Sequence, residues 1–358
     1  MKGIGSAQVA LHLISLSLVV PPSAHAIPQE RKVAEKPSRV QQIYLNTRPV
    51  CIGRYVIDIP STAEIAYGPA NAPYAIERRP GEAGRFLHII QEIVHEAQSR
   101  KSPFPIGPAS APGSKVGTVV NGFSDRQKIV YGVDFGTGAF YQFHSVVTIG
   151  NDVYVQKYSF FCDVSELSKI EEELRSIASR IIPRDVELPM EKNGVCIDGA
   201  FVLDGGHSHH EMTTLGIRLR DFADVHFSLE MIFKTRLIDS DALEPRLRSA
   251  EEQAKANGNG EWYARIKSLR RGERRIANWT GFEALLRRPP QGKYGSFHEF
   301  AFVSQGEPNN LALPVLTLDL YTGVAGNALG GQPSLTDDEA IELWDRLTGS
   351  IRPNNIDH

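Results

Sequence analysis

One short segment occurs twice in this chain, and this repetition limits the fold more than any other sequence feature. Residues 51–60 read CIGRYVIDIP and residues 196–204 read CIDGAFVLD. Each copy has Cys-Ile, a glycine, an aromatic residue, two aliphatic residues and an aspartate in that order, and the spacing differs by one residue. In the first copy, alternate side chains would face opposite sides of a sheet and Pro60 would end the run. The segment therefore predicts a short strand.

The regions that follow the two copies share an outline. Each runs from a Cys-Ile strand through a helix and a meander of strands to a final helix, and they close on SRIIP at 179–183 and GSIRP at 349–353. A chain of 358 residues also exceeds the size at which a single core usually stops growing. We therefore predict an α+β fold of two similar, duplicated lobes, each an antiparallel sheet with packed helices.

Apolar spacing predicts the main elements of both lobes. Apolar residues at helical spacing predict helices over 86–97 and 167–181, and a capping sequence at 334–337 precedes a helix that ends before Pro353. A further helix is expected over 239–256. Strand-like runs separated by turn residues cover 117–120, 127–133, 139–149, 153–161, 217–219, 225–233, 268–277, 282–288, 296–303 and 314–321.

The first residues have the pattern of a secretory signal peptide. Lys2 gives a positive start, residues 9–20 are mostly apolar, and Ala24-His25-Ala26 is a small-x-small cleavage site. The apolar run is shorter than the roughly 20 residues of a membrane-spanning helix, although an uncleaved anchor is the alternative. We expect a soluble, periplasmic protein with a signal peptide at 1–26, a flexible arm at 27–46, an N-terminal domain at 47–183, a linker at 184–194 and a C-terminal domain at 195–354.

Export to an oxidising compartment would allow one disulfide among the three cysteines, Cys51, Cys162 and Cys196. Three pairings are then open, each with one thiol left over. A Cys51–Cys162 bond would tie the start of the first domain to its end, whereas a Cys51–Cys196 bond would join the two repeated segments. Buried free thiols are the alternative to any disulfide.

The search for chemistry gives mostly negative results. A net charge of -3 offers no electrostatic basis for binding nucleic acid or an anionic membrane. The chain contains no Gly-x-Ser-x-Gly elbow, no Walker loop and no His-Glu-x-x-His motif. The sequence therefore offers none of these catalytic or nucleotide-binding motifs.

Two local clusters stand out. His207, His209, His210 and Glu211 could together bind zinc or copper, but adjacent histidines cannot easily face one ion, so a solvated loop is favoured. The basic run RRGERR at 270–275 predicts an edge strand that resists edge-to-edge pairing, or a site for an acidic partner.

The repeated segments resemble those of a known family. Residues 51–60 look like the opening of bacterial type VI secretion immunity proteins that are cognate to class-four phospholipase effectors. Residues 194–201, 271–274, 281–283 and 318–323 are similar to strands of that family's C-terminal domain. The resemblance extends over residues 44–354, and the motifs that carry it are structural.

This resemblance implies a binding protein rather than an enzyme, with no catalytic residues and no cofactor. Its implied partner is a phospholipase effector. Two lobes would grip the toxin and block its lid or substrate entrance by shape. Tight binding of this kind rests on a few buried aromatic and arginine anchors, for which Tyr141, Trp262, Tyr263 and Arg265 are candidates. The alternatives are an exported metal-binding protein that uses the His207–His210 loop, and an exported hydrolase without a recognised motif.

Overall fold

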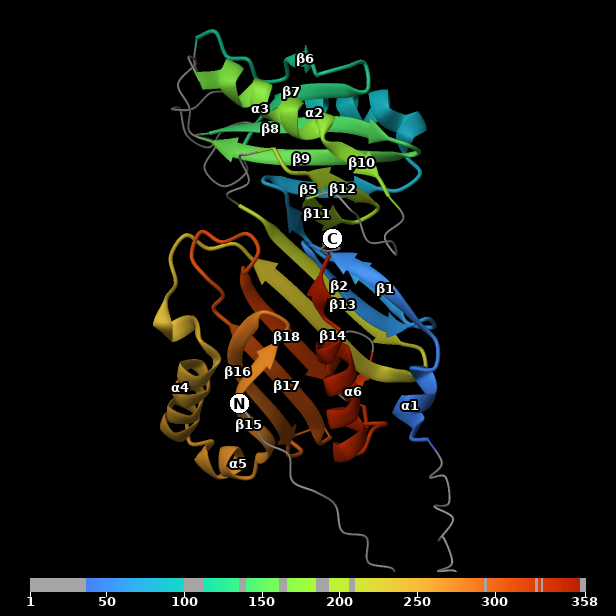
Figure 1. Ribbon diagram of the computed structural model, residues 1–358. Helices are drawn as coiled ribbons and strands as arrows, with labels where there is room; N and C mark the ends of the chain where they lie inside the picture. Colours follow the sequence, from blue (N-terminus) through green and yellow to red (C-terminus); the bar gives the residue numbers. More distant parts are fainter. Residues whose placement is uncertain are drawn as a thin grey trace, which may run out of the picture. The chain divides into compact units, whose positions relative to one another are not determined.

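The computed structural model has a mixed α+β fold with a main sheet of 13 strands (Figure 1). The predicted signal peptide, Cys162, His207 and His209 lie outside the residues that it describes. Within the described residues, no helix combines the length and the apolar character needed to cross a membrane. The structure describes residues 37–99, 112–134, 140–160, 166–184, 193–205, 210–292, 295–325, 328–329 and 331–354.

The main sheet is antiparallel at every pairing of its described strands. The predicted α+β class is therefore confirmed. The strands from the two halves of the sequence continue one pairing order, joined where β13 meets β4 at Met212 and Asn71. The order is β15 (Lys267–Ile276), β16 (Trp279–Arg288), β17 (Phe297–Ser304), β18 (Val315–Tyr321), β14 (Phe222–Ile232), β13 (Met212–Leu219), β4 (Ala70–Asn71), β5 (Ala75–Arg79), β9 (Asp152–Phe160), β8 (Tyr141–Ile149), β7 (Gln127–Val133) and β6 (Val119–Asn121), and β3 (Glu64–Tyr67) also pairs with β13.

Two helices cover opposite faces of the β7–β8–β9 meander. The apolar stripe of α2 (Phe86–Ser99) packs on Val130 of β7 and on other valines of the same face. The stripe of α3 (Leu167–Ser179) packs on the opposite face, which includes Ile129. Neighbouring residues of a strand point to opposite faces, so the uninterrupted apolar sequence of β7 serves both helices.

The second large core lies between the helix α6 (Asp337–Gly349) and the strands β13 to β18. Trp279 and Trp344 are both fully buried there. The ring of Tyr55, from the beginning of the chain, packs on Trp279 with ring centroids 4.2 Å apart. The N-terminal sequence therefore contributes to the core of the C-terminal half.

Each of the two repeated segments spans the turn of a β-hairpin. The predicted strand at 51–60 is confirmed for Tyr55–Pro60, but it was wrong for Cys51 and Ile52, which end the preceding strand. Strands β1 (Thr47–Ile52) and β2 (Tyr55–Pro60) pair around Gly53-Arg54, and β11 (Gly194–Ile197) and β12 (Ala200–Leu203) pair around Asp198-Gly199. Gly53 has φ +57° and Gly199 has φ +64°. Glycine adopts this left-handed conformation without steric cost, so the chain reverses at the glycine instead of continuing as one strand.

The two hairpins are exchanged between the two halves of the chain. The N-terminal strand β2 pairs with β21 (Arg352–Pro353), the short strand that follows α6 (Figure 1). The C-terminal strand β12 pairs with β10 (Ile181–Pro183), which follows α3. The side chains of the two hairpins are exchanged in the same way. Those of β1 and β2 join the core under α6, and those of β11 and β12 pack with residues of β8, β9 and α3. Each half is thus completed by a hairpin from the other.

The remaining elements lie at the borders of these cores. Residues 39–43 of the predicted arm form the helix α1 (Arg39–Ile43), which a capping box of Ser38 and Gln41 begins, and Val40 is fully buried. Arg39 also forms an ion pair of 2.6 Å with Glu339 of α6. The other elements are η1 (Ala83–Arg85), η3 (Asp239–Asp241), α4 (Leu243–Ala256), α5 (Gly260–Ala264), β19 (Val324–Ala325) and β20 (Ala328–Leu329).

Candidate binding surface

A disulfide fastens the two exchanged hairpins where they cross. Cys51 and Cys196 are bonded, with their Cα atoms 5.9 Å apart, so this is the pairing present among the three that the sequence left open. Beside it, the amide of Gly53 donates to the carbonyl of Cys196 at 3.1 Å, and the amide of Cys196 donates to the carbonyl of Gly53 at 2.7 Å. A Cβ at Gly53 would lie 2.8 Å from Oγ1 of Thr213, so only glycine fits this crossing.

Two arginines hold the hairpin turns. Arg54, in the turn of the first hairpin, forms ion pairs with Asp204 at 2.7 Å and Glu211 at 2.6 Å. Burial alone would lower the pKa of Arg54, but the hydrogen bonds that it donates to these two carboxylates keep the pKa above its ordinary value. In the second hairpin, the turn residue Asp198 pairs with Arg78 at 2.8 Å. Each turn is therefore fixed by charge as well as by backbone pairing.

A cavity of about 440 Å³ lies beside the second hairpin turn. Its walls come from the β3–β4 connection, from β5 and β9, and from the turn itself. The lining includes both basic and acidic side chains and two tyrosines, but no serine, cysteine or histidine that could act as a nucleophile or base.

The histidine loop gives no support to a metal site. His210 is exposed, and Glu211, the fourth predicted ligand, has its carboxylate engaged by Arg54. His207 and His209 are outside the described residues. Among the described residues, no group of three metal-ligating side chains is close enough to hold an ion. Glu211 pairs with an arginine that is distant in sequence and lies beside a glycine turn. No local sequence pattern predicts this pair without the fold.

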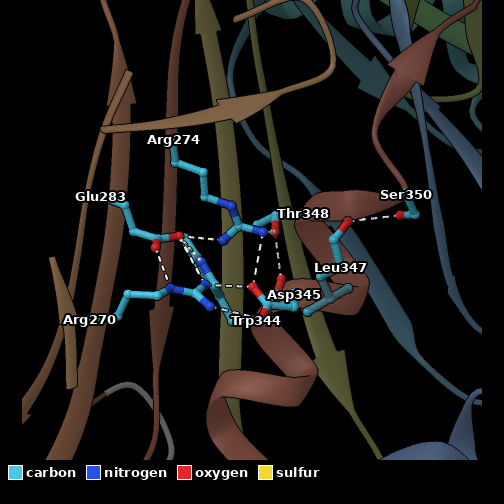
Figure 2. A network of polar contacts seen from close by, with 8 residues as sticks. All are labelled: Arg270, Arg274, Glu283, Trp344, Asp345, Leu347, Thr348 and Ser350. Atoms are coloured by element: carbon cyan, nitrogen blue, oxygen red, sulfur yellow. Dashed lines mark hydrogen bonds and ion pairs between the residues drawn. The ribbon is translucent and has the colours of Figure 1, made fainter. Parts of the chain in front are cut away.

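The basic run at 270–275 forms an edge strand, as one of its two interpretations predicted, because β15 ends the main sheet. Arg270 and Arg274 point toward α6 and converge on Glu283 of β16 (Figure 2). The carboxylate of Glu283 also accepts a hydrogen bond of 2.7 Å from Nε1 of Trp344. The same two arginines pair with Asp345 of α6, at 2.5 Å and 2.9 Å. Two of the four arginines in the run therefore attach α6 to the sheet.

A hydroxyl, an imidazole and a carboxylate line up at the start of α6. Nδ1 of His298 lies 2.9 Å from Oγ1 of Thr322, and its Nε2 lies 3.0 Å from Oδ1 of Asp337. A carboxylate only accepts, so Nε2 carries the proton. Burial lowers the pKa of His298, which keeps the ring neutral at pH 7. His298 and Thr322 are fully buried, so no substrate can reach them. The arrangement tethers α6, and the hydrolase alternative finds no support in it.

The same tether makes stability sensitive to acid. Burial opposes ionisation of Asp337, but hydrogen bonds from Lys267, His298 and Arg287 outweigh it and lower its pKa from 3.8 to about 2. A carboxylate with a lowered pKa stabilises the fold fully above its ordinary pKa, and this contribution is lost as the pH falls through 3.8 toward 2. We expect wild-type protein to have a higher melting temperature than Asp337→Asn at pH 7. The difference between the two melting temperatures should disappear near pH 2.

Thermal unfolding between pH 2 and pH 7 measures this difference. Asp338→Asn is the matched control, since Asp338 is exposed in the same helical turn. A gap between wild type and Asp337→Asn that does not change with pH would contradict the assignment.

Three of the four candidate anchors lie on or next to one short helix, and the fourth lies in a separate core. Tyr141 is buried beside Tyr131 and Phe143, in the core under α3. Trp262 and Tyr263 belong to α5, where both rings lie near the guanidinium of Arg288. Arg265 is exposed at the C-terminal end of the same helix. They do not form one anchor cluster.

Comparisons with known proteins agree with these observations. Residues 187–355 match the family model described as Tle cognate immunity protein 4 C-terminal domain. This segment includes the second hairpin, the strands β13 to β18 and α6. A comparison with curated protein sequences finds no match.

Solved structures share the fold over most of the chain. The apo structure of immunity protein TplEi of T6SS from Pseudomonas aeruginosa aligns with a TM-score of 0.69 and 20% identity, over 86% of this chain and 97% of that chain. The same protein complexed with "L" peptide aligns with a TM-score of 0.65, 20% identity, and coverage of 86% and 98%. The crystal structure of the Tle4-Tli4 complex provides a match with a TM-score of 0.69, 20% identity, and coverage of 87% and 98%.

Proposed function

We propose that this chain is an immunity protein that binds and sterically inhibits a type VI secreted phospholipase effector, because its residues 187–355 match the family model of the Tle cognate immunity protein 4 C-terminal domain. The family match carries this proposal. The shared fold supports it, because one structure with that fold is a Tle4-Tli4 complex and another holds a peptide.

Inhibition by occlusion is consistent with the chemistry of the described residues. The one hydroxyl–imidazole–carboxylate chain described above is buried, and the lining of the cavity beside the second hairpin turn includes no serine, cysteine or histidine. The disulfide at the hairpin crossing and the ion pairs at both turns hold the surface in one conformation before the partner arrives. A preorganised surface loses less conformational entropy on binding, which favours a tight complex.

We place the protein in the periplasm. Residues 1–26 have the pattern of a cleaved signal peptide, and disulfides persist in the periplasm but are rare in the cytosol. An effector that attacks phospholipids from the periplasmic side would have to be captured there.

We also propose that residues 47–183 and 195–354 are two copies of one duplicated module, joined by a linker at 184–194. Three features support a common origin. Each copy begins with a hairpin from a Cys-Ile segment, each closes on a helix, and the short strand after that helix pairs with the hairpin of the other copy. Reciprocal exchange of this kind would bind the two copies into one inhibitor.

Co-expression tests the function directly. An active cognate phospholipase effector directed to the periplasm should stop growth, and co-expression of this full chain should restore it. The two proteins should also elute together as one complex from size-exclusion chromatography. The physical reason is mass action: an effector held in a tight complex has no free substrate entrance.

A chain that lacks residues 1–26 serves as the control for compartment. It should accumulate in the cytosol and leave the periplasmic effector active. Absence of both rescue and complex formation with the full chain would refute the proposed function.

A further inference from the structure

One face of the C-terminal sheet has a row of small side chains that runs across six strands. The strand register places these residues side by side, from β3 through β13, β14, β18 and β17 to β16. All lie on the face opposite the core under α6, because the residues on either side of them in each strand point into that core or its border. The row is Ala66, Gly216, Ser228, Asp319, Ala301 and Ala284.

The two ends of this row differ. At the β16 end, Leu243 and Leu247 of α4 pack on Ala284 and its neighbours. At the β3 end, the row opens into a hollow of about 500 Å³ whose walls include Arg218, His226 and Tyr321. Small residues between larger flanking side chains make a trough, and we use this name for the stretch from Ala66 to Asp319. The trough has the shape to receive a protruding side chain from a partner.

Two acidic side chains, Asp319 in the trough and Glu230 two residues beyond Ser228 in β14, lie on this face of the sheet. Within the part of the chain that the structure describes, neither side-chain carboxylate accepts a hydrogen bond or forms an ion pair. Glu299, on the neighbouring strand, is already paired with Arg288 at 2.6 Å. Arg246 of α4 faces Asp319 without an ion pair between them. Among the described residues, these two half-buried carboxylates are thus left without an ion-pair partner.

Burial raises the pKa of Asp319 to about 6, and the charges of Glu299 and Glu230 raise it further while Arg246 lowers it. A carboxyl with a raised pKa costs the folded protein stability as the pH rises from 3.8 through 6. A cation from outside would remove this cost. The free protein therefore retains an unfavourable charge that a partner could compensate.

We propose that the trough is a docking site for a segment of the effector that carries an arginine or a lysine, whose cationic group pairs with Asp319. This inference rests on the proposed function and names the surface that performs it. Buried charge pairs across an interface give both affinity and orientation, and the unpaired carboxylates supply the negative partner.

Asp319→Asn tests the docking site because it keeps the shape and removes the charge. The variant should melt at a higher temperature than wild type at pH 7, yet bind the effector at least about tenfold more weakly, since losing one member of a desolvated charge pair costs that much or more. Glu172→Gln is the matched control: it removes one exposed carboxylate on α3 and should bind like wild type.

The pH dependence gives a second readout. Wild-type affinity should rise between pH 5 and pH 7 as Asp319 ionises, and the affinity of Asp319→Asn should change less. The charged and titratable groups around Asp319 are the same in wild type and in Asp319→Asn. They are Glu230, Glu299, Arg246, Arg288, Tyr321 and His226.

The outcomes separate the two proposals. Wild-type binding that Asp319→Asn leaves unchanged would overturn the docking site and leave the immunity function standing. A wild-type chain that binds no effector would overturn both. If Asp319→Asn fails to fold, Glu230→Gln replaces it in the same assay, and it should weaken binding in the same direction.

Discussion

Replacing both cysteines of the Cys51–Cys196 bond by alanine is expected to lower the free energy of unfolding by about 2–5 kcal/mol. The bond joins residues 145 apart in sequence, and closing so long a loop removes much conformational entropy from the unfolded chain. It is also buried, with Val56 and Phe201 packed around it, so alanine would leave a cavity. Because this bond fastens both exchanged hairpins, the loss should extend to both halves.

Denaturant unfolding of the oxidised protein measures this effect. All variants should carry Cys162→Ala, so that no alternative pairing can form, and the Cys162→Ala single variant is the reference. Added reductant should shift the reference toward the double-alanine variant. Equal unfolding midpoints for the reference and the variant without the bond would show that the disulfide does not stabilise the crossing.

Local sequence patterns predicted much of the fold because their causes are local. The runs at 127–133, 139–149 and 153–161 became β7, β8 and β9 with small changes at their ends, since apolar runs between turn residues specify strands directly. The stripe over 86–97 became α2 for the same reason. The glycine at 53 was the exception: its neighbours fit a strand, and the conformation of one residue reversed the chain.

The arrangement of the halves could not be predicted in this way. The sequences of β2 and β12 are compatible with completing either half of the chain. Apolar periodicity predicts a strand but does not predict which strand it pairs with. The Cys51–Cys196 pairing depended on this exchange, so it remained one of three alternatives until the fold was known. Adjacent histidines drew attention to a metal site, whereas the partner of Glu211 was Arg54, 157 residues away.

The trough illustrates the same limit. Ala66, Gly216 and Asp319 are unremarkable in sequence, because each is an outward-facing residue of an alternating strand. Only the register of several strands brings them into one row. A binding surface that arises from pairing across a sheet leaves no motif in any one segment, which is why the search for motifs found no site here.

Glu283→Ala is expected to destabilise the protein by about 3–5 kcal/mol, because it breaks a buried ion pair by removing one partner. The side chain of Glu283 is only 3% exposed, and its carboxylate pairs with Arg270 and Arg274 and accepts from Trp344 (Figure 2). Its loss would leave two partly buried guanidinium groups short of a charge and the buried indole N–H of Trp344 without an acceptor. The helix α6 would then lose its main polar attachment to β15 and β16.

Asp345→Asn provides the matched control, because Asp345 pairs with the same two arginines but its side chain is 41% exposed. Solvent screens such a pair, so a loss of only about 0–1 kcal/mol is expected. Denaturant unfolding of both variants measures the difference between two carboxylates that share their partners and differ in burial. A loss for Glu283→Ala as small as that for Asp345→Asn would mean that packing of the apolar stripe of α6, rather than the charge network, holds the helix on the sheet.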